Sequence, residues 1–152
     1  DGILKIGNSV EKIGFRAFTS CAKLTGDIII PDSVKSIGNE SFLSNKGFDG
    51  DFYICSGMAS IPSRTFEGCV NIKSIEVNSE NQTYYAKGNC LISREAKELI
   101  FGCKNSVIPQ DDGILKILSS GRAPAAISNL SQSRLGIASF TPAPVVVVTL
   151  TI

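Results

Sequence analysis

Five cysteines and no histidine limit the chemistry that this sequence could support. A catalytic cysteine needs a neighbouring base, usually a histidine, that takes the proton of the thiol. A structural zinc site would favour a Cys-x-x-Cys pair, and no two cysteines of the chain have that spacing. The cysteines therefore predict neither a catalytic centre nor a zinc site.

Two pairs of acidic residues lie close together in the sequence and could suggest calcium: Asp49 with Asp51, and Asp111 with Asp112. A calcium loop needs oxygen ligands at alternating positions along a longer segment, and both pairs lack them. No glycine-rich phosphate loop follows a predicted strand. We interpret the acidic pairs as solvated turns and expect no catalytic residue, no metal and no cofactor.

The charge of the chain is nearly balanced, with a net charge of +1 at pH 7. A net charge this close to zero does not indicate the basic surface that nucleic-acid-binding proteins have. Residues 1–117 hold all 14 acidic residues and 13 of the 15 basic ones. The apolar run Val145–Ile152 has eight residues, whereas a membrane helix needs about 20, so we expect no membrane insertion within this chain.

Apolar residues recur at a step of 24 positions over the first half of the chain. Six columns keep this step over three units: Phe18, Phe42 and Phe66; Ile13, Ile37 and Ile61; Ile6, Ile30 and Ile54; Val10, Val34 and Met58; Leu24, Phe48 and Ile72; Cys21, Asn45 and Cys69. A fixed period of this length is the signature of a repeat protein.

Each unit opens with a short strand whose first and third residues are apolar, at 4–6, 28–30 and 52–54. A glycine corner and a short helical turn, at 14–18 and 38–42, then bring one phenylalanine toward the core. A single unit cannot bury its apolar face alone, but stacked units can. The spacing therefore predicts a solenoid with a parallel sheet.

The expected domain covers residues 1–117, with regular units at 1–26, 27–50 and 51–74 and an irregular region at 75–117. Within that region, two apolar runs separated by polar residues predict a β-hairpin over 84–103 that projects from the stack.

Residues 118–152 lose the repeat motif and contain no acidic residue and no cysteine. We expect a poorly ordered non-repeat tail or an irregular cap. The alternative is that Val145–Ile152 adds one strand to the end of the stack.

The motif resembles a known repeat family. Residues 30–38 with Phe42, and residues 10–18 with Cys21, are similar to the BspA-type (Treponema pallidum-type) leucine-rich repeat. That motif runs roughly Ile-Pro-x-Ser-Val-x-x-Ile-Gly-x-x-Ala-Phe-x-x-Cys-x-x-Leu. The chain departs from it at Gly7 and Cys55, which replace the proline, and at Asn45, which replaces the cysteine.

The resemblance covers about residues 1–117 and implies a right-handed leucine-rich-repeat superhelix, mainly β with short helical turns. It also implies a surface or secreted protein of the kind found in bacteria and some parasitic protists. Such proteins use the repeat for adhesion and protein binding. It specifies a fold and not a reaction.

Cys21 and Cys69 stand in one column, two units apart. Stacked strands lie about 4.8 Å apart, which would separate their Cα atoms by about 9.6 Å. A disulfide rarely joins Cα atoms more than about 7 Å apart. We therefore interpret both as small core residues, although a redox pair is the alternative.

The middle residue of each strand should point away from the core, which places Lys5, Ile29, Tyr53 and Glu76 on the outer face of the sheet. Ile29 beside Tyr53 would form an apolar and aromatic patch flanked by charge, as in a binding hot spot. The alternative is an ordinary cross-strand pair that stabilises the sheet by less than about 1 kcal/mol.

These expectations favour a non-enzymatic protein-binding or adhesion module of a cell-surface or secreted protein. Its partner would be a protein ligand such as a host surface or extracellular matrix protein. The alternative function is a structural spacer that presents another domain of a longer surface protein.

Overall fold

A computed structural model describes residues 2–62, 64–107 and 109, and the strands 115–118 and 145–148. Its strands are β1 (Gly2–Ile3), β2 (Lys12–Ile13), β3 (Leu24–Thr25), β4 (Ile28–Ile29), β5 (Ser36–Ile37), β6 (Asp51–Ile54), β7 (Ser74–Val77), β8 (Tyr84–Lys87), β9 (Cys90–Ser93), β10 (Leu99–Gly102), β11 (Leu115–Leu118) and β12 (Val145–Val148). The described ranges contain no helix.

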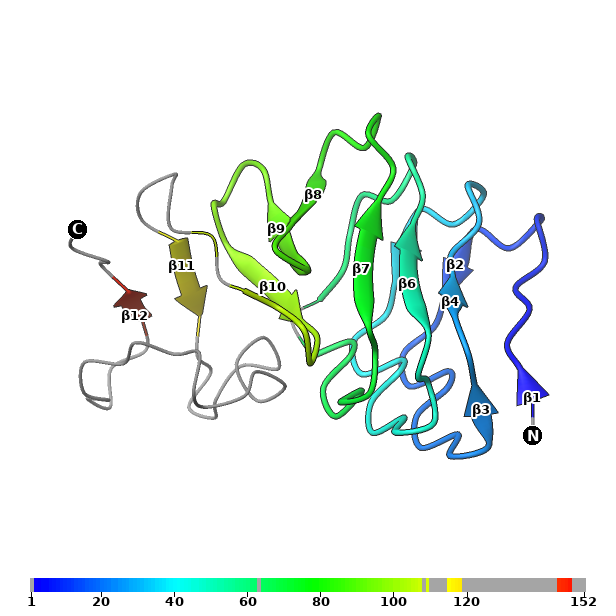
Figure 1. Cartoon of the computed structure of the whole chain (residues 1–152). Helices are drawn as coiled ribbons and strands as arrows, with labels where there is room; N and C mark the ends of the chain where they lie inside the picture. Colours follow the sequence, from blue (N-terminus) through cyan, green and yellow to red (C-terminus); the bar gives the residue numbers. More distant parts are fainter. Residues whose placement is uncertain (1, 63, 108, 110–114, 119–144, 149–152) are drawn as a thin grey trace.

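Parallel strands join equivalent positions of successive units. Ile28 of β4 pairs with Phe52 of β6, and Ile13 of β2 pairs with Ile37 of β5, in both cases one repeat period further along the chain. From β6 to β7 the step falls one position short of that period, because Phe52 pairs with Ile75. Figure 1 shows β4, β6 and β7 side by side. The sequence period therefore sets the pairing register of β2 with β5 and of β4 with β6.

The alternation of side chains decides which face of each strand is buried. Phe52 and Ile54 of β6 are fully buried, while Asp51 is exposed and Tyr53 is half-buried. In β4, Ile28 is fully buried and Ile29 is 57% exposed. The inner face of the sheet thus consists of large apolar side chains, and the outer face remains open to solvent.

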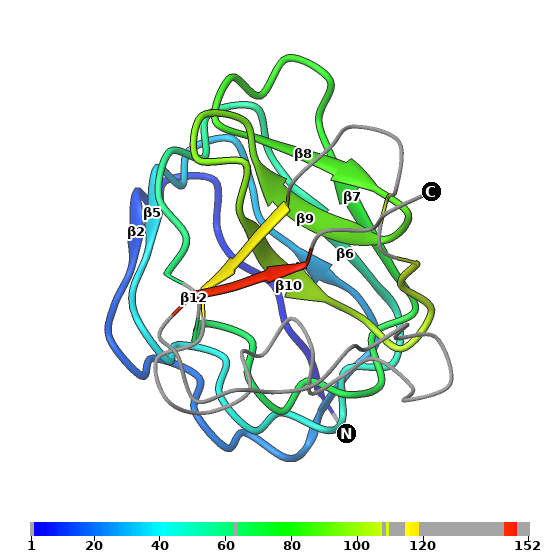
Figure 2. The same ribbon diagram turned by 90° about the vertical axis from the view of Figure 1, so that its left-hand side faces the viewer.

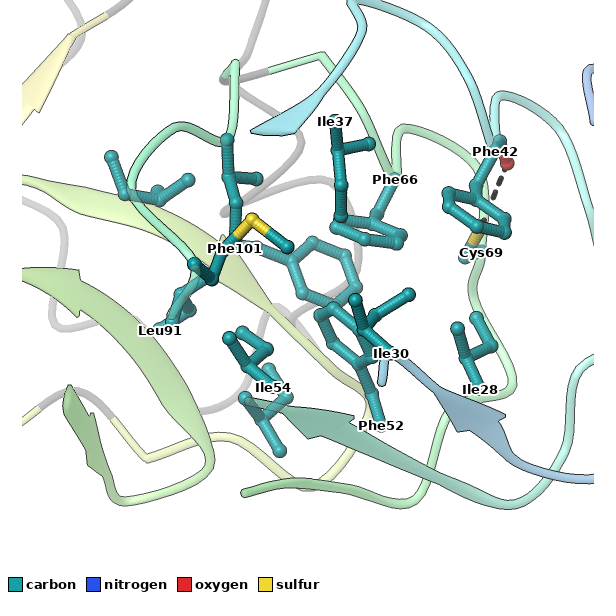
Figure 3. Packing of buried hydrophobic residues seen from close by; sticks show 14 of the residues in the cluster. Ile28, Ile30, Ile37, Phe42, Phe52, Ile54, Phe66, Cys69, Leu91 and Phe101 are labelled. Carbon is teal, nitrogen blue, oxygen red and sulfur yellow. Dashed lines mark hydrogen bonds between the residues drawn. The ribbon is translucent and has the colours of Figure 1, made fainter. Parts of the chain in front are cut away.

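A column of phenylalanine rings forms the centre of the core. Ring centroids are 5.2 Å apart from Phe18 to Phe42, from Phe42 to Phe66 and from Phe66 to Phe101. Figure 3 shows Phe42, Phe66 and Phe101 among the buried aliphatic side chains. One more repeat period after Phe66 would reach Cys90, so β10 supplies the fourth ring instead of the repeat position.

The short helical turns expected within each unit are not helical. Arg16, Ser20, Glu40 and Ser44 have positive φ angles of 55°, 56°, 58° and 61°. Left-handed residues at every fourth position interrupt a right-handed helix. Every second amide reaches the next unit instead, as in the bond from the Phe18 amide to the Ser41 carbonyl at 2.7 Å, whereas the amides of Ala17 and Thr19 bond to carbonyl oxygens three residues back. Hydrogen bonds between units therefore alternate with turn bonds within each unit, and no helix forms.

Asn45 shows how the chain accommodates a departure from the repeat motif. Its side chain is fully buried, and its amide donates to the carbonyl oxygens of Phe18 at 2.6 Å and Phe42 at 3.0 Å. In the next unit the thiol of Cys69 reaches the same Phe42 oxygen at 3.0 Å (Figure 3). Both side chains satisfy buried carbonyl groups that would otherwise destabilise the fold.

The segment expected to project as a hairpin packs against the core. Strands β8, β9 and β10 form one antiparallel sheet in the order β10-β9-β8. Leu91 and Phe101 are 0% and 1% exposed, and Phe101 lies next to both Phe66 and Phe52. Figures 1 and 2 show this sheet beyond β7, toward the C-terminal side of the stack. It covers apolar side chains that a projecting hairpin would leave exposed.

Strand β12 pairs antiparallel with β11, from Leu115 opposite Val148 to Leu118 opposite Val145. The expectation that residues 118–152 form a poorly ordered tail falls, apart from these strands, outside the described residues.

An ion-pair ladder crosses three units at one repeat column. Arg16 and Arg64 flank Glu40 at nitrogen-to-oxygen distances of 2.8 and 2.6 Å, and Arg64 also contacts Glu67 at 2.9 Å. The Glu40 side chain is only 6% exposed. The hydrogen bond from Arg16 is the main reason that the pKa of Glu40 lies below its ordinary value of 4.5, and burial opposes it.

This ladder predicts a specific loss of stability in acid. Because the pKa of Glu40 is lower in the folded than in the unfolded chain, its contribution is present above the unfolded pKa and is lost as pH falls through the folded pKa. Glu40→Gln should lower the free energy of unfolding at neutral pH and flatten its dependence on pH below about 4.5. Urea unfolding across that range measures both effects. Glu95→Gln, at an exposed position, is the control, and parallel pH curves for wild type and Glu40→Gln would contradict the prediction.

Candidate interaction surface

The outer side of β4, β6 and β7 is the surface where the structure brings predicted site residues together. We define the sheet face as the outward-pointing residues of these strands together with the residue that precedes β4: Asp27, Ile29, Asp51, Tyr53, Ser74 and Glu76. Their side chains alternate with Ile28, Phe52 and Ile75, which point into the core.

Three of the four predicted site residues lie in one row of the sheet face. Ile29 pairs with Tyr53, and Tyr53 pairs with Glu76, so the three side chains stand next to one another across the strands. Lys5 is exposed but does not continue this row. Strand β1 ends at Ile3 and pairs Gly2 with Leu24 of β3, a step shorter than the repeat period, so the pairing register of the first unit differs from that of β4 and β6.

Tyr53 is held in position from the side. Its hydroxyl oxygen accepts a hydrogen bond from the side-chain amide of Asn78 at 3.1 Å. The ring is half-buried, whereas Ile29 beside it is 57% exposed. A fixed aromatic ring next to an exposed aliphatic side chain gives apolar contact area with little entropy to lose on binding.

The charges of the sheet face are all negative. Asp27, Asp51 and Glu76 are exposed, and the six positions include no lysine or arginine. Within the described ranges, ion pairs join only Arg16, Glu40, Arg64 and Glu67, and none of these lies on the sheet face. The exposed Lys73 stands just before β7 and forms no such pair there.

All five cysteines are described and unpaired. Cys21 is half-exposed, and the other four are buried. Burial raises the pKa of the Cys69 thiol to about 12 and that of the Cys90 thiol to about 11. These two thiols are therefore protonated at neutral pH, which is the state of structural rather than reactive cysteines. The described residues hold no group of three or more metal-ligating side chains.

Sequence reasoning missed the ladder of Arg16, Glu40 and Arg64, although the signal was available. The three residues share one repeat column, and their charges alternate in sign from one unit to the next. The hydrogen bond from Asn78 to Tyr53 had no such signal, because the two residues belong to different columns.

Comparison with known proteins assigns the repeat. Residues 3–111 match the family described as BspA type leucine-rich repeat region (6 copies). The chain belongs to this family. The BspA type match covers Ile3 of β1 and the whole of β2 to β10, and so includes the three strands of the sheet face. A search of curated proteins found no match.

Two solved structures are similar to this BspA type chain. A leucine-rich repeat protein from Eubacterium ventriosum has a TM-score of 0.51 and 20% identity, and the similarity covers 71% of this chain and 32% of that one. The pneumococcal vaccine antigen PcpA has a TM-score of 0.46 and 17% identity, over 67% of this chain and 32% of that one. The first similarity supports a leucine-rich repeat fold. This chain spans about a third of the length of either protein.

Proposed function

We propose that this chain is a non-enzymatic protein-binding module of a cell-surface or secreted protein and that its ligand is a protein. Residues 1–117 would form the module as a right-handed solenoid, with regular units at 1–26, 27–50 and 51–74. A host surface or extracellular matrix protein is the partner that we would test first. No helix in the described part of the chain is long and apolar enough to cross a membrane.

One observation carries this proposal: the exposed row of Ile29, Tyr53 and Glu76 across three strands. Interfaces are anchored by aromatic and apolar groups near their centre, and polar groups surround them. The row has that composition, and its tyrosine is already fixed by Asn78. Lys5, which is exposed outside the row, would contribute at its margin.

The proposal predicts saturable binding that depends on the row. The chain should capture a ligand from host surface and extracellular proteins, and Tyr53→Ala or Ile29→Asn should weaken that binding by roughly 30-fold, as for hot-spot residues. Biolayer interferometry measures the affinities, and circular dichroism checks that the variants are folded. The control is Val107→Asn, because Val107 is 53% exposed and lies outside the sheet face.

Two outcomes would contradict the proposal. A well-folded chain that captures no protein would favour a structural spacer that presents another domain. A ligand whose binding is insensitive to Tyr53 and Ile29 would place the interaction on another surface.

A further inference from the structure

The charged residues of the sheet face indicate the chemistry of its binding partner more closely than the apolar pair of Ile29 and Tyr53 does alone. Its two rows are Asp27, Asp51 and Ser74, and Ile29, Tyr53 and Glu76. Neighbouring positions in a row are about 4.8 Å apart, and the rows are about 7 Å apart along the strands. The apolar pair therefore has carboxylates on two sides within the length of one side chain.

Asp27 and Asp51 stand one repeat apart at the ends of adjacent strands. Like charges on neighbouring strands destabilise a sheet, and no lysine or arginine of the described chain pairs with either residue. One carboxylate oxygen of Asp27 accepts a hydrogen bond from the backbone amide of Asp51 at 2.8 Å. The Asp27 side chain therefore has a structural role in the turn before β6. No comparable contact within the described ranges accounts for the carboxylates of Asp51 and Glu76.

We propose that the sheet face binds a protein segment that bears lysine or arginine side chains on both sides of an apolar residue. The apolar residue would rest on Ile29 and the ring of Tyr53. The cationic groups would lie against Asp51 on one side and Glu76 on the other. This inference rests on the proposed function, because it names the partner chemistry of the same face.

Electrostatic complementarity supports this occupant over the alternatives. An acidic segment or a nucleic acid would meet three carboxylates with no cation on the face to balance them. A purely apolar segment would cover Ile29 and Tyr53 but would leave Asp51 and Glu76 close to an apolar surface and less hydrated. A cationic segment with one apolar residue matches both kinds of group.

The test uses the whole chain and three short fluorescent peptides. In the first, one leucine is flanked by lysines. The second has glutamate in place of each lysine, and the third has serine in place of the leucine. We expect the lysine–leucine peptide to bind most tightly, and its affinity should fall as salt screens the exposed charges. Fluorescence anisotropy measures the affinities.

Charge-neutral variants locate the effect. The double variant Asp51→Asn with Glu76→Gln should bind the lysine–leucine peptide roughly five- to tenfold more weakly. The matched double variant Glu11→Gln with Glu95→Gln removes two exposed carboxylates outside the sheet face and should leave binding unchanged. Circular dichroism confirms that both double variants are folded.

Three outcomes of the peptide measurements would overturn the inference. The first is equal binding of the lysine and glutamate peptides, the second is no binding of the lysine–leucine peptide, and the third is an equal effect of the two double variants. The inference would also be wrong if a natural ligand required Tyr53 but bound the Asp51→Asn, Glu76→Gln double variant as tightly as the wild type. The proposed function would then still stand. Failure of the proposed function appears separately, as a natural ligand insensitive to Tyr53.

Discussion

Phe42→Ala is expected to lower the free energy of unfolding by roughly 3–5 kcal/mol. The Phe42 side chain is fully buried, and its ring lies between those of Phe18 and Phe66, with centroid distances of 5.2 Å to each. The ring of Phe48 adds an edge contact at 6.2 Å. Removing the ring opens a cavity in the middle of the aromatic column, where neighbouring units hold the backbone in place. Urea unfolding followed by circular dichroism gives the value.

Tyr53→Ala is the comparison for that measurement, because it removes a ring of similar size from the outer face of the sheet. Tyr53 is half-buried and loses one hydrogen bond from Asn78, so the decrease should be clearly smaller. A shift of one residue in strand register would exchange the two faces of the sheet. Equal losses for Phe42→Ala and Tyr53→Ala would therefore contradict the register of the repeats.

Gly38→Ala is expected to destabilise the chain by about 1–3 kcal/mol through steric overlap between units. A methyl group at Gly38 would lie 2.6 Å from the carbonyl carbon of Gly14 and 2.6 Å from the amide nitrogen of Phe15. Both are backbone atoms of the preceding unit, and the Gly38 amide is bonded to the Ile13 carbonyl oxygen at 2.8 Å. Neither backbone can move without breaking contacts along the stack.

Gly14→Ala provides a matched control in the same repeat column, one unit earlier in the chain. A methyl group at Gly14 would meet no atom within 4 Å. We expect a change within about 0.5 kcal/mol, as at surface sites without special contacts. Thermal and urea unfolding of the two variants should therefore differ strongly, and similar stabilities would show that the units do not approach as closely as Gly38 requires.

The pairing of the repeats could be predicted from the sequence because the period carries it. Ile28 opposite Phe52 and Ile13 opposite Ile37 follow directly from the repeat period. Alternation within each strand then separates buried Phe52 from half-buried Tyr53. Both properties depend on local spacing.

Local spacing does not reveal which competing hydrogen bonds form. The segments after Gly14 and Gly38 resemble helical turns, but every second amide bonds to the next unit, and residues such as Arg16 and Glu40 adopt positive φ. The position of Phe101 in the aromatic column also could not be predicted, because β10 lies outside the period and reaches the core only through tertiary packing.

The sheet face was predicted better in its centre than at its edge. Ile29, Tyr53 and Glu76 share a row because their strands β4, β6 and β7 pair directly with one another. Lys5 belongs to the first unit, whose strand β1 pairs with β3 of the same unit. The repeat period alone does not show that residues 4–6 stay outside the sheet of β4, β6 and β7.

The most direct test of the binding face is the dissociation constant of the captured ligand for Ile29→Asn beside Val107→Asn. Both changes place the same amide at an exposed aliphatic position, 57% and 53% exposed, and only Ile29 lies on the sheet face. We predict that Ile29→Asn weakens binding by roughly 30-fold and that Val107→Asn leaves it unchanged. Equal dissociation constants for the two folded variants would contradict the assignment of β4, β6 and β7 as the interaction surface.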